Sequence, residues 1–206
     1  MHNRLETDRL VLRRFTEDDA DSLFDLDSDP EVMRFLSGGE PTPRTAIETD
    51  ILPRFLHYGD RSSGFGFWAA IDKASGDFLG WFSLRPSDEI DPGEASLGFR
   101  LRRAAWGQGY ATEGAQALLR LGFTALGVER VVATTYQDNL ASRRVMEKAG
   151  MTLSRTFRLS AADLGRVDTY LVPSQDLWDG DDVEYSLQKA DWEQPDSMEA
   201  PKGRRE

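Results

Sequence analysis

A strand-like run, a glycine-containing loop and a helix-like run follow one another between residues 94 and 125, and this succession constrains the fold most. Residues 94–101 have the composition of a β-strand, and residues 111–125 repeat apolar side chains at helical spacing. In the loop, Gly107 and Gly109 permit close approach of the backbone to a ligand. The free N–H groups and the dipole at the start of a helix favour an anion. The segment therefore predicts an α/β protein with a site for a phosphate-bearing ligand.

Two common phosphate-binding loops do not fit this segment. The dinucleotide-binding fingerprint needs a third glycine, but Thr112 stands three residues after Gly109, and no strand with an acidic end follows at the required spacing. The nucleotide-triphosphate loop needs a Gly-Lys-Ser/Thr sequence, which does not follow here. Glycines alone are also compatible with a plain structural turn, so the ligand class depends on a second motif.

The remaining patterns indicate one domain of mixed strands and helices. Besides 94–101, we expect strands at residues 7–15, 66–72, 78–84, 128–136, 152–159, 167–173 and 183–187. Besides 111–125, we expect helices at residues 16–26, 30–35, 43–58 and 140–149; Pro53 interrupts the third of these and Gly150 ends the last. The domain is expected to span residues 7–190, and the charged, proline-containing residues 191–206 to form a mobile tail.

Composition excludes several classes of function. The chain has 206 residues and no cysteine, which excludes disulfides, thiolate metal sites and an acyl-cysteine intermediate. Its net charge of -11 argues against general nucleic-acid binding. No apolar run approaches the roughly 20 residues that a membrane span needs, and the N-terminus lacks the apolar stretch of a secretion signal. We expect a cytoplasmic protein that is not embedded in a membrane.

A second motif follows the strand expected at 128–136. It has the sequence Asn-Leu-Ala-Ser-Arg-Arg-Val-Met-Glu-Lys-Ala-Gly-Met over residues 139–151, after Trp-Gly-Gln-Gly-Tyr-Ala-Thr-Glu over residues 106–113. Together the two blocks resemble the GNAT superfamily of N-acyltransferases, and within it the RimJ/RimL-like branch of ribosomal-protein acetyltransferases. The opening Thr-x-Arg-Leu-x-Leu-Arg from Thr7 and the sequence Asp168-Thr169-Tyr170 are similar to that branch.

This resemblance implies a fold and a reaction. The fold is a single α/β (α+β) domain, with helices on both faces of a mixed central sheet of about seven strands, whose two central parallel strands splay apart. The pantetheine arm of an acyl-CoA lies between these strands along residues 97–101, and its pyrophosphate lies on the loop at residues 107–112. The reaction transfers an acyl group, acetyl in the first instance, from acyl-CoA to a primary amine of a small molecule or a protein N-terminus. It proceeds by direct attack in a ternary complex, without a metal.

The resemblance also implies the site residues. A backbone N–H near Phe99 to Leu101 stabilises the oxyanion, Ser142 donates a proton to the leaving thiolate, and Asn139 hydrogen-bonds the pantetheine arm. Asn139 is also compatible with a helix cap. A basic stretch near the anionic cofactor comprises Arg100, Arg102, Arg103, Arg143, Arg144 and Lys148. The full set of expected cofactor contacts is Phe99, Arg100, Leu101, Arg103, Trp106, Gly107, Gln108, Gly109, Tyr110, Ala111, Thr112, Asn139, Ser142 and Arg144.

The sequence departs from the family at two positions. Ser96 stands where many relatives carry a glutamate, so the base that deprotonates the amine has two candidates: Glu94, on the same face of the strand, and Asp163. Each is also compatible with a solvated surface carboxylate. Ala104 stands where a basic or amide residue begins the family's loop, and the neighbouring Arg103 is its substitute or a plain exposed arginine. We expect Trp106 to pack in the core.

Three functional alternatives remain open on the sequence alone. The first is an acetyl-CoA-dependent N-acetyltransferase, and the second uses succinyl-CoA or another acyl-CoA donor. The third is a catalytically inactive acyl-CoA-binding or regulatory module, which the missing glutamate at position 96 allows. The protein is expected to be a monomer or a homodimer. If aromatic residues line a cleft, they could receive a cationic amine; the candidates are Phe35, Phe55, Tyr58, Phe65, Phe67, Trp68 and Trp81.

Overall fold

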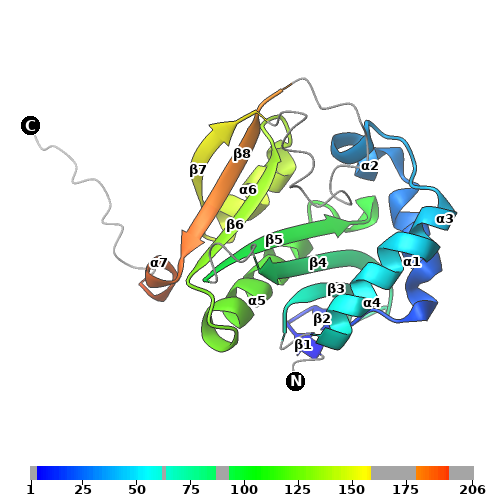
Figure 1. Cartoon of the computed structure of the whole chain (residues 1–206), viewed down its shortest axis with the longest axis horizontal. Coiled ribbons are helices and arrows are strands. Elements are labelled where there is room, and N and C mark those ends of the chain that lie inside the picture. Colours follow the sequence, from blue (N-terminus) through cyan, green and yellow to red (C-terminus); the bar gives the residue numbers. More distant parts are fainter. Residues whose placement is uncertain (1–3, 62–63, 87–92, 159–179, 195–206) are drawn as a thin grey trace, which may run out of the picture.

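The computed structural model of the chain describes residues 4–61, 64–86, 93–158 and 180–194. These residues form an eight-stranded mixed sheet in the order β1-β2-β3-β4-β5-β6-β8-β7 (Figure 1). The strands are β1 (Arg4–Glu6), β2 (Leu10–Arg13), β3 (Gly66–Asp72), β4 (Phe78–Pro86), β5 (Glu94–Leu101), β6 (Arg130–Tyr136), β7 (Thr152–Phe157) and β8 (Asp182–Gln188). Neighbouring strands are antiparallel except β5 and β6, which are parallel.

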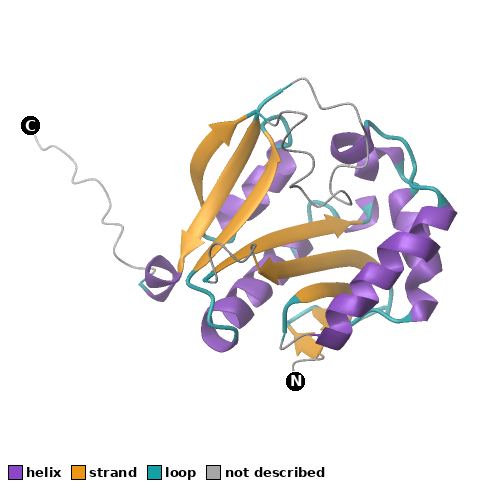
Figure 2. Ribbon diagram, viewed as in Figure 1, coloured by secondary structure: helices purple, strands orange, loops and turns teal. Residues whose placement is uncertain are grey.

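Helices cover both faces of this sheet (Figure 2). They are α1 (Ala20–Asp27), α2 (Pro30–Ser37), α3 (Arg44–Ala46), α4 (Leu52–Arg61), α5 (Tyr110–Ala125), α6 (Leu140–Lys148) and α7 (Lys189–Glu193). A π-helical turn, Ile47–Ile51, joins α3 to α4 immediately before Pro53. Proline has no N–H to donate to the carbonyl four residues earlier, so the predicted interruption of this helix is confirmed as a widened turn.

Side chains alternate between the two faces of the sheet along each strand, so a separate core forms on each face. On the face covered by α5 and α6, a core forms around Leu12, Phe82, Leu118 and Met146. On the face covered by α1 to α4, a second core forms around other residues, including Leu23, Ile51, Phe55, Phe67 and Trp81. Adjacent residues of one strand, such as Trp81 and Phe82, therefore belong to different cores.

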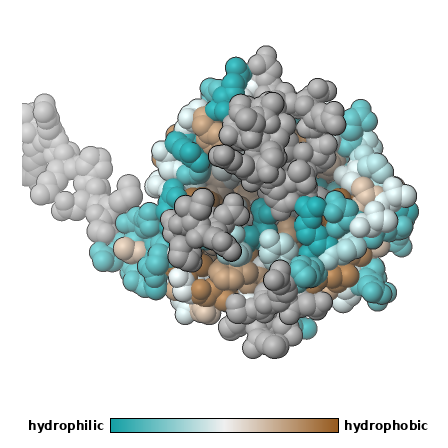
Figure 3. Space-filling model, viewed as in Figure 1, coloured by the Kyte–Doolittle hydropathy of each residue, from teal (hydrophilic) through white to brown (hydrophobic). Residues whose placement is uncertain are grey.

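The helix α5 lies very close to the sheet. A Cβ atom added at Gly114 would lie 2.2 Å from the ring of Phe82 in β4, so only glycine fits there. The aromatic side chains Phe55, Phe67, Trp68 and Trp81 are fully buried, which makes them core residues and not the walls of an amine-binding cleft. The face in view mixes hydrophilic and hydrophobic surface (Figure 3).

Most expected elements are present, and the differences lie at the ends of the domain. The hairpin of β3 and β4 and the helices α5 and α6 lie where the sequence predicts them, and Gly150 has the left-handed backbone, with φ of 96°, expected after a helix. The strand β1 and the helix α7 were not expected. Helix α7 runs past the boundary expected at residue 191, because Trp192 packs on Phe123 of α5 with ring centroids 5.5 Å apart. The strand expected at 167–173 lies outside the described residues.

None of the described helices combines the length and apolar character needed to cross a membrane. Within the same residues, no group of three or more histidine or carboxylate side chains is placed to hold a metal ion.

Candidate functional site

The parallel strands β5 and β6 separate after a short stretch of pairing. Paired residues run only from Glu94 and Arg130 to Ser96 and Val132. Beyond that point β5 continues to Leu101 and β6 to Tyr136, and the two strands diverge (Figure 1). The splay that the resemblance implied is therefore present, and the second half of β5 has a strand neighbour, β4, on one side only.

The backbone of this half of β5 presents unpaired edge groups toward the opening. The N–H of Arg102 donates to the carbonyl of Leu79 at 2.8 Å, which fixes the alternation of the antiparallel β4–β5 ladder. In that alternation Gly98 and Arg100 bond to β4, whereas Leu97 and Phe99 turn their N–H and C=O groups away from it. Pro86, which has no N–H, faces Ala95 at a position of the same unbonded set. The opening thus offers main-chain amides to an extended ligand.

The loop between β5 and α5 leaves the start of the helix open. Gly107 and Gly109 have φ values of 72° and 84°, in the left-handed region that glycine alone adopts without cost. Gly109 is the residue that caps α5, and no side chain caps the first turn. A Cβ atom added at Gly107 would meet nothing within 4 Å. These features fit a diphosphate, because the free helical N–H groups and open space coincide.

A set of hydrogen bonds from the segment between β1 and β2 holds this loop in place. Arg9 donates from Nε to the carboxylate of Glu113 at 2.7 Å and from Nη1 to the carbonyl of Gln108 at 2.8 Å. Its guanidinium also lies 4.4 Å from the centre of the Tyr110 ring. Burial raises the pKa of Glu113, but hydrogen bonds from Thr7 and Arg9 outweigh it, so the net pKa is lowered. Thr7 and Arg9 belong to the sequence motif from Thr7 to Arg13, but the sequence alone did not identify Glu113 as their partner.

Three predicted cofactor residues point elsewhere. Arg100 is buried and donates to Asp27 of α1 at 2.7 Å, so its side chain does not supply charge to the loop. Tyr110 directs its hydroxyl to Asp72 at 3.2 Å. The prediction that Trp106 packs in the core is wrong: the side chain is 46% exposed, and its Nε1 donates to the carbonyl of Leu101 at 2.8 Å. The indole caps the end of β5 because that carbonyl has no strand partner.

The basic stretch is divided between structural and exposed positions. Arg143 donates to the hydroxyl of Tyr185 at 3.1 Å and to the carbonyl of Gln137 at 3.0 Å, and therefore serves the packing of α6. Arg103 and Arg144 are exposed. Among the predicted cofactor contacts, these two arginines keep their charges at the surface.

At the start of α6, the sequence-predicted pair Asn139 and Ser142 is brought together. The Asn139 side chain accepts from the N–H of Ser142 at 3.2 Å, so the helix-cap interpretation of Asn139 is confirmed. Both residues are half-buried and follow the free end of β6, while the glycine loop follows the free end of β5. The two helix N-termini thus border the same opening.

The first base candidate, Glu94, lies at the closed end of the opening in a network of charges. It forms an ion pair with Arg130, which also contacts Glu184 at 3.1 Å. Glu184 in turn binds Arg155 at 2.7 Å, and these partners outweigh its burial and lower its pKa. Arg130 therefore lies between the carboxylates of Glu94 and Glu184 and holds Glu94 in an ion pair. The second candidate, Asp163, lies outside the described residues.

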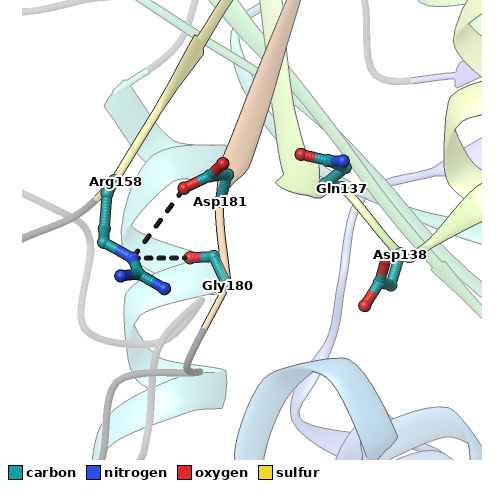
Figure 4. A pocket seen from close by; sticks show the side chains of 5 residues that line it. All are labelled: Gln137, Asp138, Arg158, Gly180 and Asp181. Carbon is teal, nitrogen blue, oxygen red and sulfur yellow. Dashed lines mark hydrogen bonds and ion pairs between the residues drawn. The ribbon is translucent and has the colours of Figure 1, made fainter.

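A polar cavity of about 220 Å³ adjoins Asn139 at the end of β6 (Figure 4). Its lining comes from the ends of three strands and comprises Gln137, Asp138, Arg158, Gly180 and Asp181. Arg158 reaches the carbonyl of Gly180 at 3.5 Å and the carboxylate of Asp181 at 3.8 Å. Sequence reasoning missed this cavity because its residues are distant along the chain and share no motif.

Comparisons with known proteins agree with this geometry. A family model described as an acetyltransferase (GNAT) domain matches residues 9–152. The chain is 32% identical over 195 residues to an FsC-acetyl coenzyme A-N(2)-transacetylase of Aspergillus fumigatus, a match that covers 91% of this chain and 77% of the relative.

Two solved structures share the fold. The ribosomal-protein-S5-alanine acetyltransferase from Vibrio fischeri has a TM-score of 0.68 at 16% identity, over 92% of this chain and 98% of the neighbour. The microcin C7 self immunity acetyltransferase MccE, in complex with acetyl-CoA and AMP, has a TM-score of 0.67 at 16% identity, over 88% and 93%. At these identities the likeness concerns the fold alone. The family match and the curated relative, together with the splayed strands, show that this chain belongs to the GNAT family of acetyltransferases.

Proposed function

We propose that this protein is an N-acetyltransferase that transfers an acetyl group from acetyl-CoA to a primary amine by direct attack in a ternary complex. The observation that carries the proposal is the divergence of β5 and β6 after Ser96 and Val132, next to an uncapped helix start. In acyl-CoA, the amides of the pantetheine arm can pair with the free edge of β5, and the diphosphate that follows can bind the N–H groups at the start of α5.

Different residues along the opening bind different parts of acyl-CoA. The N–H and C=O groups of Leu97 and Phe99 pair with the pantetheine amides, and one of these N–H groups stabilises the oxyanion. The N–H groups of residues 109–112 hold the diphosphate. The further cofactor contacts are those that the family motif gives apart from the Arg100 side chain, which is bound to Asp27, with Arg103 and Arg144 as the exposed cations. Acetyl-CoA supplies the thioester carbonyl that the amine attacks.

Proton movements accompany the exchange of bonds. The amine forms the new N–C bond as the C–S bond breaks, and Ser142 is the candidate that donates a proton to the departing sulfur. The amine must first lose a proton to a carboxylate, directly or through water. Glu94 is paired with Arg130, and Asp163 lies outside the described residues, so the variants Glu94→Gln and Asp163→Asn are needed to separate the two candidates. The true base, when removed, eliminates the limb of the kcat/KM profile that rises with pH.

The comparisons favour acetyl as the acyl group and nitrogen as the acceptor atom. The name of the Aspergillus fumigatus relative specifies acetyl coenzyme A and N(2). The structural neighbour from Vibrio fischeri is a ribosomal-protein acetyltransferase, which keeps the RimJ/RimL-like branch and a protein N-terminus among the acceptors to test. Small amines and N-terminal peptides therefore both belong in the acceptor panel.

Thiol release tests the proposal. We expect acetyl-CoA plus one class of amine to release free CoA, and succinyl-CoA to do so far more slowly. We also expect CoA to raise the melting temperature, because a ligand that binds only the folded state stabilises it. Stabilisation by CoA without turnover across the panel would point instead to an inactive binding module. A melting curve indifferent to saturating CoA would exclude both.

A further inference from the structure

The splayed half of β5 has few side chains that can contact other elements on the face that α1 covers. Along Leu97 to Leu101 only Gly98 and Arg100 lie on that face, because side chains alternate along a strand. Gly98 contributes no side chain, and a Cβ atom there would lie 2.8 Å from the hydroxyl of Ser83. Arg100 is therefore the one side chain through which this half-strand is held from the α1 side.

Arg100 is bound to Asp27, the last residue of α1. The Arg100 Nη1 to Asp27 Oδ1 distance is 2.7 Å, and the two side chains are 4% and 0% exposed. The guanidinium also lies 5.3 Å from the ring centre of Trp81, the residue opposite Arg100 in the ladder. A charge pair this deeply buried is costly to desolvate, so apolar residues of similar size would hold the strand to the helix at least as well for stability alone.

The same end of α1 makes two further contacts. The carbonyl of Asp27 accepts from the N–H of Thr42, a buried residue between α2 and α3, at 3.1 Å. Asp25 lies 3.6 Å from Arg102, the residue that begins the loop to α5. The end of α1 thus contacts the strand whose edge faces the opening and the loop that leads to the diphosphate site.

We propose that Asp27 and Arg100 are positioning residues for the acyl-CoA site, an inference that rests on the proposed function. Where β6 no longer supports β5, the pair sets the orientation of the strand, and so aims the backbone groups of Leu97 and Phe99 into the opening. A directional pair with fixed hydrogen-bond geometry orients a strand more sharply than apolar contact does.

The decisive variant removes both charges. In Asp27→Leu/Arg100→Met both charges of the pair are removed together, so neither is left buried without the other, and the protein is expected to fold with a melting temperature near that of the wild type. We expect it to bind CoA roughly tenfold more weakly, because small errors in position are expensive for binding and rate. Isothermal titration with CoA measures this effect without requiring an acceptor. The single variant Arg100→Lys keeps the charge but loses the planar geometry. Its affinity for CoA is expected to lie between that of the wild type and that of the double variant.

A second ion pair serves as the matched control. Arg13 and Asp19 are joined by two hydrogen bonds of 2.7 Å on the same face of the sheet, but on β2, away from the opening. The variant Asp19→Leu/Arg13→Met is expected to change stability and leave the affinity for CoA at the wild-type value. Wild-type affinity in a folded Asp27→Leu/Arg100→Met variant would overturn the positioning role alone. A wild-type protein that does not bind CoA would overturn the proposed function itself.

Discussion

At the scale of single residues, the proposed diphosphate site depends on glycines. Gly107 and Gly76 both have a left-handed backbone, with φ of 72° and 80°, and a Cβ atom at either would meet no other atom within 4 Å. One lies in the loop before α5 and the other in the turn between β3 and β4. The two positions therefore share the same backbone strain and differ only in what is expected to occupy the space beside them.

This pair yields a matched prediction. Gly107→Ala and Gly76→Ala are each expected to lower the free energy of unfolding by about 1–2 kcal/mol, the cost of a left-handed non-glycine residue. Only Gly107→Ala is expected to raise KM for acetyl-CoA as well, because its methyl group enters the space of the diphosphate. Urea unfolding and thiol-release kinetics on both variants test this. Equal KM values would remove Gly107 from the binding site.

Among the elements, α5 depends on hydrogen bonds from the segment between β1 and β2. Glu113, in the first turn of α5, accepts from the backbone N–H of Arg9 at 2.8 Å as well as from the Arg9 and Thr7 side chains. These bonds lower its pKa. A carboxyl group whose folded pKa is lowered contributes stability above its unfolded pKa of about 4.3 and loses that contribution as the pH falls through the folded value.

We therefore expect acid to destabilise the wild type more than Glu113→Gln. The difference in unfolding free energy between the two proteins is greatest at neutral pH and shrinks below about pH 4.3. Urea denaturation at pH 7 and pH 3.5 measures it. Glu129→Gln, at a carboxylate that is 67% exposed, is the control and is expected to change the unfolding free energy little, because an exposed ion pair contributes little stability. A pH-independent difference for Glu113→Gln would show that the bonds do not depend on its charge.

Elements with local signals were predictable from the sequence, and those that depend on distant partners were not. Asn139 and Gly150 mark the ends of α6 in the sequence itself. In contrast, α7 is held by the packing of Trp192 on Phe123, and Arg100 is bound to a residue 73 positions away. The exposure of Trp106 was likewise unpredictable, since it follows from the unpaired carbonyl of Leu101.

Across the whole molecule, the sheet is joined through β5 and β6 by only three residue pairs. The family motif predicted this splay, but the placement of β8 between β6 and β7 follows from the tertiary pairing of strands that the sequence does not order. Helix α5 also packs against α6, where Gln116 donates to the carbonyl of Lys148 at 3.2 Å. This packing gives a second connection between the part of the sheet that ends at β5 and the part that begins at β6.

Amide exchange across the sheet gives a test at this level. Saturating CoA is expected to slow hydrogen exchange at Leu97 and Phe99, whose N–H groups face the opening. It is expected to change Gly98 and Arg100 far less, because their N–H groups already bond to β4. Residue-resolved exchange by NMR distinguishes these outcomes. Uniform slowing along β5 would indicate general stabilisation of the fold and not pairing at the edge.

The free edge of β5 beyond Ser96 has a consequence for the specificity of the proposed enzyme. Main-chain groups at a strand edge recognise an extended backbone with amides at suitable intervals, and they are indifferent to whatever is attached at its far end. Under the proposed function, this edge recognises the pantetheine arm and does not distinguish between acyl groups. We therefore expect the side chains around Ser96, where β5 and β6 first separate, to distinguish between them.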